Sequence, residues 1–84
     1  MKLYMARSIA GHDKGQLYVV LGEDGKDLLL VNGTSRTMDK PKRKRKGHVQ
    51  PVVHFSGTLL DAAADIDSWT DENVRRIIRL ATDM

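Results

Sequence analysis

The stretch QLYVVLGEDGKDLLLVNG, residues 16–33, has the clearest structural pattern in the chain. Its first part, residues 16–22, is rich in the β-branched and aromatic residues that favour strands. Its second part, residues 27–32, is an apolar run of strand length. Asp24 and Gly25 lie between these parts and form a pair typical of tight hairpin turns, because glycine adopts positive φ without steric cost. The stretch therefore predicts a β-hairpin.

Further short strands are expected on both sides of this hairpin. Residues 3–9 show the two-residue alternation of a strand. Residues 34–38 can form a short fourth strand, and residues 48–56 return to strand character. Pro51 cannot donate a ladder hydrogen bond, so the last strand lies at an edge or contains a bulge. Several short strands joined by tight turns predict a mainly β fold, either a small barrel or a sandwich.

The apolar residues change period in the C-terminal third, which predicts a helix over residues 71–82. Thr70 is placed to cap its first turn, and Trp69 can pack back onto the helix. A spacing of four residues predicts ion pairs within the helix, Asp71 with Arg75 and Glu72 with Arg76. The apolar stripe of this helix consists of Val74, Ile77, Ile78 and Ala81.

The chain is expected to divide into a β unit over residues 1–56 and a linker with the C-terminal helix over residues 57–84. Residues 57–68 are either a linker throughout or contain a short helix over residues 59–65. At 84 residues the protein is one small domain with an appended element. The sequence has no cysteine, no signal-peptide pattern and no apolar run of the roughly 20 residues that a membrane span needs. We therefore expect a cytoplasmic protein.

Positive charge is concentrated in residues 36–46, which contain seven basic residues and one acid, a net charge of +6. The whole chain has a net charge of +3, so the remainder sums to −3. Such a patch is typical of a protein whose partner carries phosphates. Like charges repel, and Lys40 precedes Pro41, which favours extended chain. These features predict that residues 39–47 form an exposed, mobile basic arm.

The order of motifs in the first half resembles the KOW motif, a strand–loop–strand unit with glycine in its loop. The matching residues are Ile9-Ala10-Gly11-His12-Asp13-Lys14-Gly15, followed by the apolar Val19-Val20-Leu21. Further matches to bacterial KOW-domain RNA-binding proteins, which are similar to a large-subunit ribosomal protein family, are Val31-Asn32-Gly33, Arg36, Lys40-Pro41-Lys42-Arg43-Lys44 and His48. His12 stands where the family commonly has arginine, and Asn32 where it commonly has aspartate.

This resemblance, which covers residues 3–53, implies a small SH3-like β-barrel with a C-terminal α-helix. It also implies a non-enzymatic, translation-linked protein that binds ribosomal or other structured RNA as a ribosomal or ribosome-associated component. The loop glycines would let the backbone approach a phosphate, and each lysine or arginine would displace condensed counterions. The residues expected to contact RNA are Gly11, His12, Lys14, Gly15, Arg36, Lys40, Lys42, Arg43, Lys44, Arg45, Lys46 and His48.

Other chemistry has little support in the sequence. The serines lie in no nucleophile-elbow pattern, and no phosphate-binding loop of the GxxxxGK[ST] type is present. The histidines match no common metal-ligand spacing, so no metal or cofactor is expected. The aromatic residues lie outside the basic arm, which favours recognition of RNA by backbone and shape over stacking on single strands.

Two alternatives stay open. The chain could be a protein-interaction module that contacts an acidic protein surface, or a transcription-linked KOW module that contacts RNA polymerase or DNA. The C-terminal helix is the expected contact for ribosomal proteins.

Overall fold

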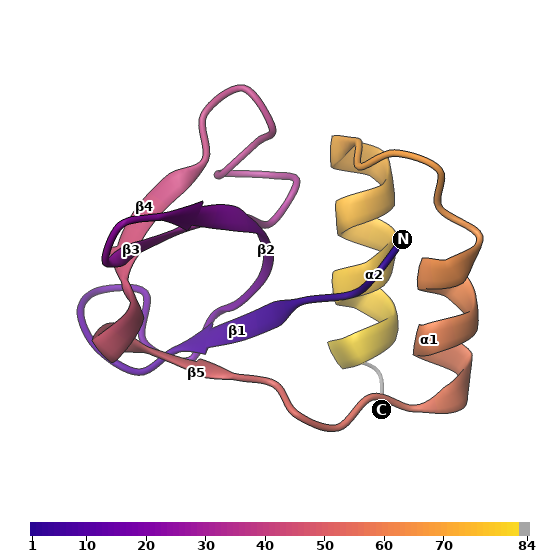
Figure 1. Ribbon diagram of the computed structural model, residues 1–84, viewed down its shortest axis with the longest axis horizontal. Helices are drawn as coiled ribbons and strands as arrows, with labels where there is room; N and C mark the ends of the chain where they lie inside the picture. The colour runs from indigo at the N-terminus through magenta and orange to yellow at the C-terminus, as the bar shows by residue number, and fades with distance from the viewer. Residues whose placement is uncertain (83–84) are drawn as a thin grey trace.

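The computed structural model describes residues 1–82, which form one curled antiparallel sheet with two helices packed against one side (Figure 1). The strands are β1 (Met5–Ser8), β2 (Leu17–Asp24), β3 (Asp27–Val31), β4 (Lys42–Arg45) and β5 (Val49–Pro51). The helices are α1 (Gly57–Ala64) and α2 (Asp71–Thr82), and a 3₁₀ turn, η1 (Lys46–His48), joins β4 to β5. The predicted mainly β fold with a C-terminal helix is confirmed.

The sheet has the strand order β4-β3-β2-β1-β5, so β4 and β5 form its two edges. Only the three residues of η1 separate these edge strands in the sequence. The sheet must therefore curl until its edges approach at this corner, as Figure 1 shows. Within residues 1–82 the ladder does not close between β4 and β5, so the sheet is open.

The central hairpin forms as predicted, with β2 and β3 paired from Val19 opposite Val31 to Asp24 opposite Asp27. Gly25 occupies the turn at a φ of 63°, which explains the glycine there. A register shift between Val20 and Gly22 marks a bulge in β2. Such a bulge increases local twist and supports the curl of the sheet.

The curled sheet buries side chains on both of its faces. Neighbouring residues of a strand point to opposite faces, so Val19 faces the helices while Tyr18 and Val20 face the inside of the curl. The core inside the curl consists of Ala6, Tyr18, Val20, Leu28, Leu30 and Val49. The core between sheet and helices consists of Leu3, Met5, Val19, Val31, Leu59, Ala62, Ala63, Ile66, Val74 and Ile77.

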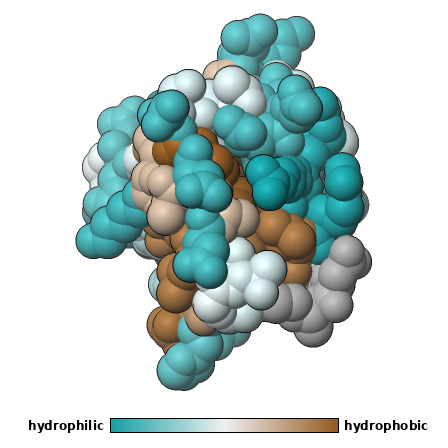
Figure 2. Space-filling model, turned by 90° about the vertical axis from the view of Figure 1, so that its right-hand side faces the viewer, coloured by the Kyte–Doolittle hydropathy of each residue, from teal (hydrophilic) through white to brown (hydrophobic). Residues whose placement is uncertain are grey.

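The C-terminal helix is confirmed with its predicted bounds, and Thr70 caps it by accepting a hydrogen bond from the Asn73 amide at 3.1 Å. The segment before it, where the sequence left two possibilities, is the helix α1, capped by the Ser56 hydroxyl. Figure 2 shows the helix side of the molecule as a largely hydrophilic surface with apolar areas between the polar side chains. Neither helix within residues 1–82 is long and apolar enough to cross a membrane.

The ion pairs predicted within α2 do not occur among the described residues. The Asp71 carboxylate instead accepts a hydrogen bond from the Met38 amide at 2.8 Å, which ties α2 to the β3–β4 connection. The Arg75 guanidinium donates a hydrogen bond to the Gly33 carbonyl at 2.7 Å instead of pairing with Asp71. Tertiary partners have thus replaced the local helical pairing.

The strand predicted over residues 34–38 is wrong, because this segment is a compact turn. The Asn32 side-chain oxygen accepts from the amides of Thr34 and Arg36, at 3.0 and 2.9 Å. The Arg36 carbonyl in turn accepts from the amides of Asn32 and Gly33. Because these hydrogen bonds join groups within residues 32–36, they hold the segment in a turn and not in a strand.

The free arm predicted over residues 39–47 is wrong from Lys42 onward, where the chain forms regular structure, although most of these residues are exposed as predicted. Its Lys42–Arg45 part is the strand β4, which pairs with β3 from Leu30 opposite Lys42 to Asp27 opposite Arg45. The side chains of β4 alternate between partly buried and exposed. Repulsion between the like charges of β4 would disfavour a strand, but acids from other segments, Asp13, Asp24 and Asp27, form ion pairs with its side chains.

Candidate nucleic-acid interface

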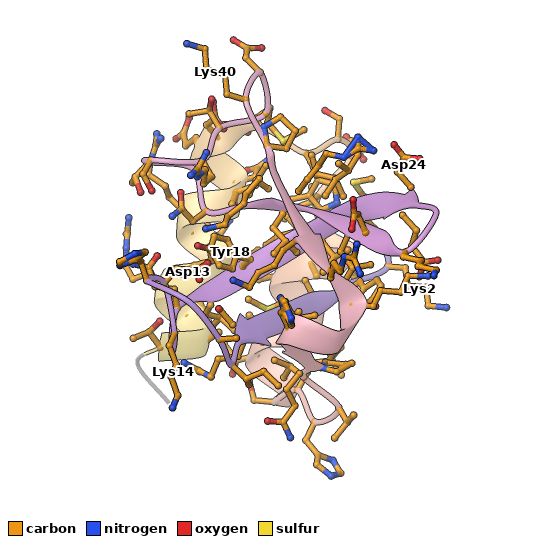
Figure 3. All side chains as sticks on the ribbon, turned by 90° about the vertical axis from the view of Figure 1, so that its left-hand side faces the viewer. Lys2, Asp13, Lys14, Tyr18, Asp24 and Lys40 are labelled. Atoms are coloured by element: carbon orange, nitrogen blue, oxygen red, sulfur yellow. The ribbon has the colours of Figure 1, made fainter. Side chains whose placement is uncertain are left out.

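Asp13 is the centre of a buried polar network between the β1–β2 loop and β4. Its side chain is shielded, with the residue only 8% exposed. One carboxylate oxygen accepts from the Ser8 hydroxyl and the Lys44 ammonium, both at 2.8 Å. The other accepts from the Tyr18 hydroxyl at 2.8 Å and lies 3.1 Å from the Lys42 ammonium. Figure 3 shows Asp13 and Tyr18 beside each other on this face.

The network keeps Asp13 ionised. Burial alone would raise the pKa of this carboxyl, but the hydrogen bonds from Lys44, Tyr18, Ser8 and Lys42 outweigh it and hold the pKa well below its usual range. Burial and the hydrogen bond to Asp13 raise the pKa of Tyr18 to about 12. Near neutral pH one carboxylate therefore neutralises charge from Lys42 and Lys44 inside the domain.

The two glycines of the β1–β2 loop serve the geometry of this network. Gly11 and Gly15 have φ values of 85° and 93°, which residues with a Cβ atom rarely adopt. Gly15 donates its amide to the Ser8 carbonyl at 2.8 Å and accepts a hydrogen bond from Arg7 at 2.7 Å. The loop thus folds back on β1 and presents Asp13 to β4.

The remaining basic residues of the run divide into paired and unpaired groups. Arg43 forms ion pairs with Asp24 and Asp27, and Lys46 with Glu23 at 2.9 Å. These pairs are exposed, whereas the side chain of Lys44 is only 10% exposed. Within residues 1–82 the predicted lysine and arginine contacts without an acidic partner are Lys14, Arg36, Lys40 and Arg45. Figure 3 shows Lys14 and Lys40 pointing away from the body of the domain.

Three sequence-predicted residues from separate segments meet at one open hollow of about 310 Å³, which we call the loop hollow. His12 comes from the β1–β2 loop, Arg36 from the turn after β3, and Lys42 from the start of β4. The full lining is His12, Asp13, Gln16, Tyr18, Ser35, Arg36 and Lys42.

Other predicted residues lie at the opposite end of β4. Arg45, Lys46 and His48 line a hollow of about 470 Å³ beside the hairpin turn, together with Lys26. Lys42 and Arg45 are three residues apart on β4, a separation of about 10 Å at the rise of a β-strand. The predicted contacts therefore form two basic areas joined by β4.

Sequence reasoning missed the two residues that organise this face, Asp13 and Tyr18. The available signal was the two-residue spacing of Lys42 and Lys44, which places both ammonium groups on one side of a strand. A lone acid in a glycine-bounded loop is the matching counter-charge. Neither signal predicts which acid would meet the strand.

No group of three or more metal-ligating side chains occurs in the part of the chain that the structure describes. No protein-family model matches the chain, and no curated protein is significantly similar to it. Function is therefore inferred from the site alone.

Proposed function

We propose that this chain is a non-enzymatic RNA-binding protein of the cytoplasm that holds structured RNA, foremost ribosomal RNA, on its β4 face. The observation that carries the proposal is the meeting of His12, Arg36 and Lys42 at the loop hollow. Figure 3 shows Lys14 and Lys40 pointing outward at opposite ends of this face, below and above Asp13 and Tyr18. Basic side chains gathered from separate segments onto one face are typical of a surface that follows a phosphate backbone.

We also propose that the curled sheet is an open form of the SH3-like, KOW-type barrel. The support is its connectivity, in which a single 3₁₀ turn joins the two edge strands. The Asp13 network adds support, because it ties the β1–β2 loop to β4 across the curl.

The contacts to phosphate differ from those expected of a free arm. Lys42 and Lys44 are held by Asp13, so they shape the surface more than they bind phosphate. The exposed pairs of Arg43 and Lys46 contribute about 0–1 kcal/mol each and can exchange onto phosphates. The principal phosphate contacts are then Lys14, Lys26, Arg36, Lys40 and Arg45.

Binding of a stem–loop RNA, measured against salt, tests this proposal. With about five phosphate contacts, the slope of log K against log[salt] should be about −4. Binding should exceed that of an isolated peptide of residues 39–47, because the peptide lacks the loop and the Arg36 turn. A single-stranded oligouridine and a DNA duplex of the stem sequence are the comparison ligands.

The variant Arg36→Gln should weaken RNA binding and reduce the magnitude of the salt slope by about one. Arg76→Gln removes the same charge from an exposed position on α2 outside the hollows described above and is the matched control. If the bare peptide binds as tightly as the whole protein, the folded face is not an RNA site. Tighter binding to the DNA duplex would favour a transcription-linked role.

A further inference from the structure

A third basic hollow, a groove, lies between the sheet and α2, and of its lining residues only Gly15 belongs to the set predicted from the sequence. It is an open hollow of about 490 Å³, within the size range of small-ligand sites. Arg7 enters it from β1, and Arg75 and Arg79 enter it from α2. The lining is Arg7, Gly15, Gln16, Leu17, Asn32, Thr34, Arg75, Ile78, Arg79 and Thr82.

The groove is suited to an anion. Of the described residues that line it, none is acidic. Arg7 donates to the Gly15 carbonyl and Arg75 to the Gly33 carbonyl, each at 2.7 Å. A guanidinium has five N–H donors, so each of these two keeps further donors for a ligand while its position is held. Two arginines fixed in this way are a preorganised site for the oxygens of a phosphate.

The groove borders the loop hollow. Gln16 lines both of them. The turn after β3 also contributes to both, with Thr34 on the groove side and Arg36 on the loop-hollow side. A nucleic acid backbone can therefore pass from the cations of one hollow to those of the next across the polar side chain of Gln16.

We infer that this groove binds a phosphate of the RNA backbone next to the segment held at the loop hollow, so that α2 is part of the RNA interface. This inference rests on the proposed function. The arginines would take the phosphate oxygens, and the partly buried Leu17 and Ile78 would lie against the sugar or base of the same nucleotide. The groove thus extends RNA recognition beyond the β4 face.

The test compares Arg79→Gln with Arg76→Gln in the full-length protein, using the stem–loop RNA as the ligand. Both changes remove one charge from an exposed position of α2, but only Arg79 lines the groove. Arg79 is chosen because Arg7 and Arg75 also hold backbone carbonyls, so their loss would disturb the fold. Unchanged circular dichroism and thermal midpoint confirm that both variants are folded.

Arg79→Gln should weaken RNA binding about tenfold, the loss expected for a hydrogen bond to a charged group. It should also reduce the magnitude of the salt slope by about one, whereas Arg76→Gln should change neither quantity. In NMR spectra, RNA should shift the side-chain Nε–Hε signals of Arg7 and Arg75 and leave that of Arg76 in place. Inorganic phosphate at the same concentration should shift them far less if a nucleotide is the ligand.

The outcomes separate the two proposals. The first outcome is that the wild type binds RNA and that Arg36→Gln weakens this binding, whereas Arg79→Gln binds RNA as Arg76→Gln does. In that case the groove inference is wrong and the proposed function stands. If inorganic phosphate shifts the Arg7 and Arg75 Nε–Hε signals as much as RNA does, the inference that the groove binds a nucleotide is also wrong. If the wild type binds RNA no better than the bare peptide, both proposals fail.

Discussion

The Asp13 carboxylate determines how much of the basic run is available to a partner. It accepts hydrogen bonds from Ser8 and Tyr18 and neutralises charge on Lys42 and Lys44. A buried carboxylate is costly unless it is fully hydrogen-bonded, and within residues 1–82 no buried side-chain polar atom is left without a partner. Asp13, which lies outside the basic run, thus lowers the net positive charge that the run presents at the surface.

Replacing this carboxylate should destabilise the domain strongly. Asp13→Asn keeps the size of the side chain but leaves the Lys42 and Lys44 ammonium groups without their counter-charge. The expected loss is about 3–5 kcal/mol of unfolding free energy, as for removal of one member of a buried ion pair. Urea unfolding measures it, with Asp39→Asn at an exposed position as the control. A loss equal to that of the control would show that the network is not structural.

The raised pKa of Tyr18 predicts a loss of stability at high pH. Its folded pKa of about 12 exceeds the usual tyrosine pKa of 10.0, so the neutral hydroxyl contributes stability below about pH 10. This contribution should disappear as the pH rises from about 10 to 12. Unfolding free energies measured across this range should fall for the wild type and fall less for Tyr18→Phe. Parallel curves for the two proteins would contradict the assignment.

Among the secondary-structure elements, β4 has two functions on its two faces. Lys42 and Lys44 are partly buried and reach Asp13, whereas Arg43 and Arg45 are exposed. Side chains of a strand alternate in direction, so one element anchors the β1–β2 loop and presents cations outward. A run of five basic residues is therefore not five equivalent phosphate contacts.

Two neighbours on β4 should give opposite phenotypes. Lys44→Gln should lower the unfolding free energy, because the Lys44 side chain is only 10% exposed and is paired with Asp13. It should leave the salt slope of RNA binding nearly unchanged. Arg45→Gln should leave stability within about 0.5 kcal/mol. It should reduce the magnitude of the salt slope by about one. Chemical denaturation and salt titration of both variants measure these quantities. Equal effects on the slope would mean that both side chains reach phosphate.

The complete domain depends on contacts between its β part and its helices. Met5, Val19 and Val31 of the sheet, with Leu3 just before β1, share one core with residues of both helices. A sheet this small has little apolar area to bury without that cover. The helices therefore stabilise the curl and, through Arg75, contribute to its charged surface.

A chain shortened to residues 1–56 should not fold. Removal of α1 and α2 uncovers the apolar side chains that face them, and the curled sheet keeps only its inner core. The expected result is a poorly dispersed amide spectrum and no cooperative thermal transition. A dispersed spectrum from the shortened chain would show that the β part is an independent domain.

The hairpin and α2 could be predicted because their signals are local. A strand alternates over two residues, a helix repeats over 3.6, and the Asp24–Gly25 turn and the Thr70 cap mark the ends. The basic run is likewise visible in the sequence as charge density. The meeting of Lys42 and Lys44 with Asp13, and of Arg75 with Arg7 at one groove, depends on residues far apart in the chain. The sequence predicts repulsion along the basic run, because neighbouring residues there carry like charges. The stability of β4 depends instead on the acids that lie near it in space, such as Asp13 and Asp27, and only the tertiary structure brings these acids to the strand.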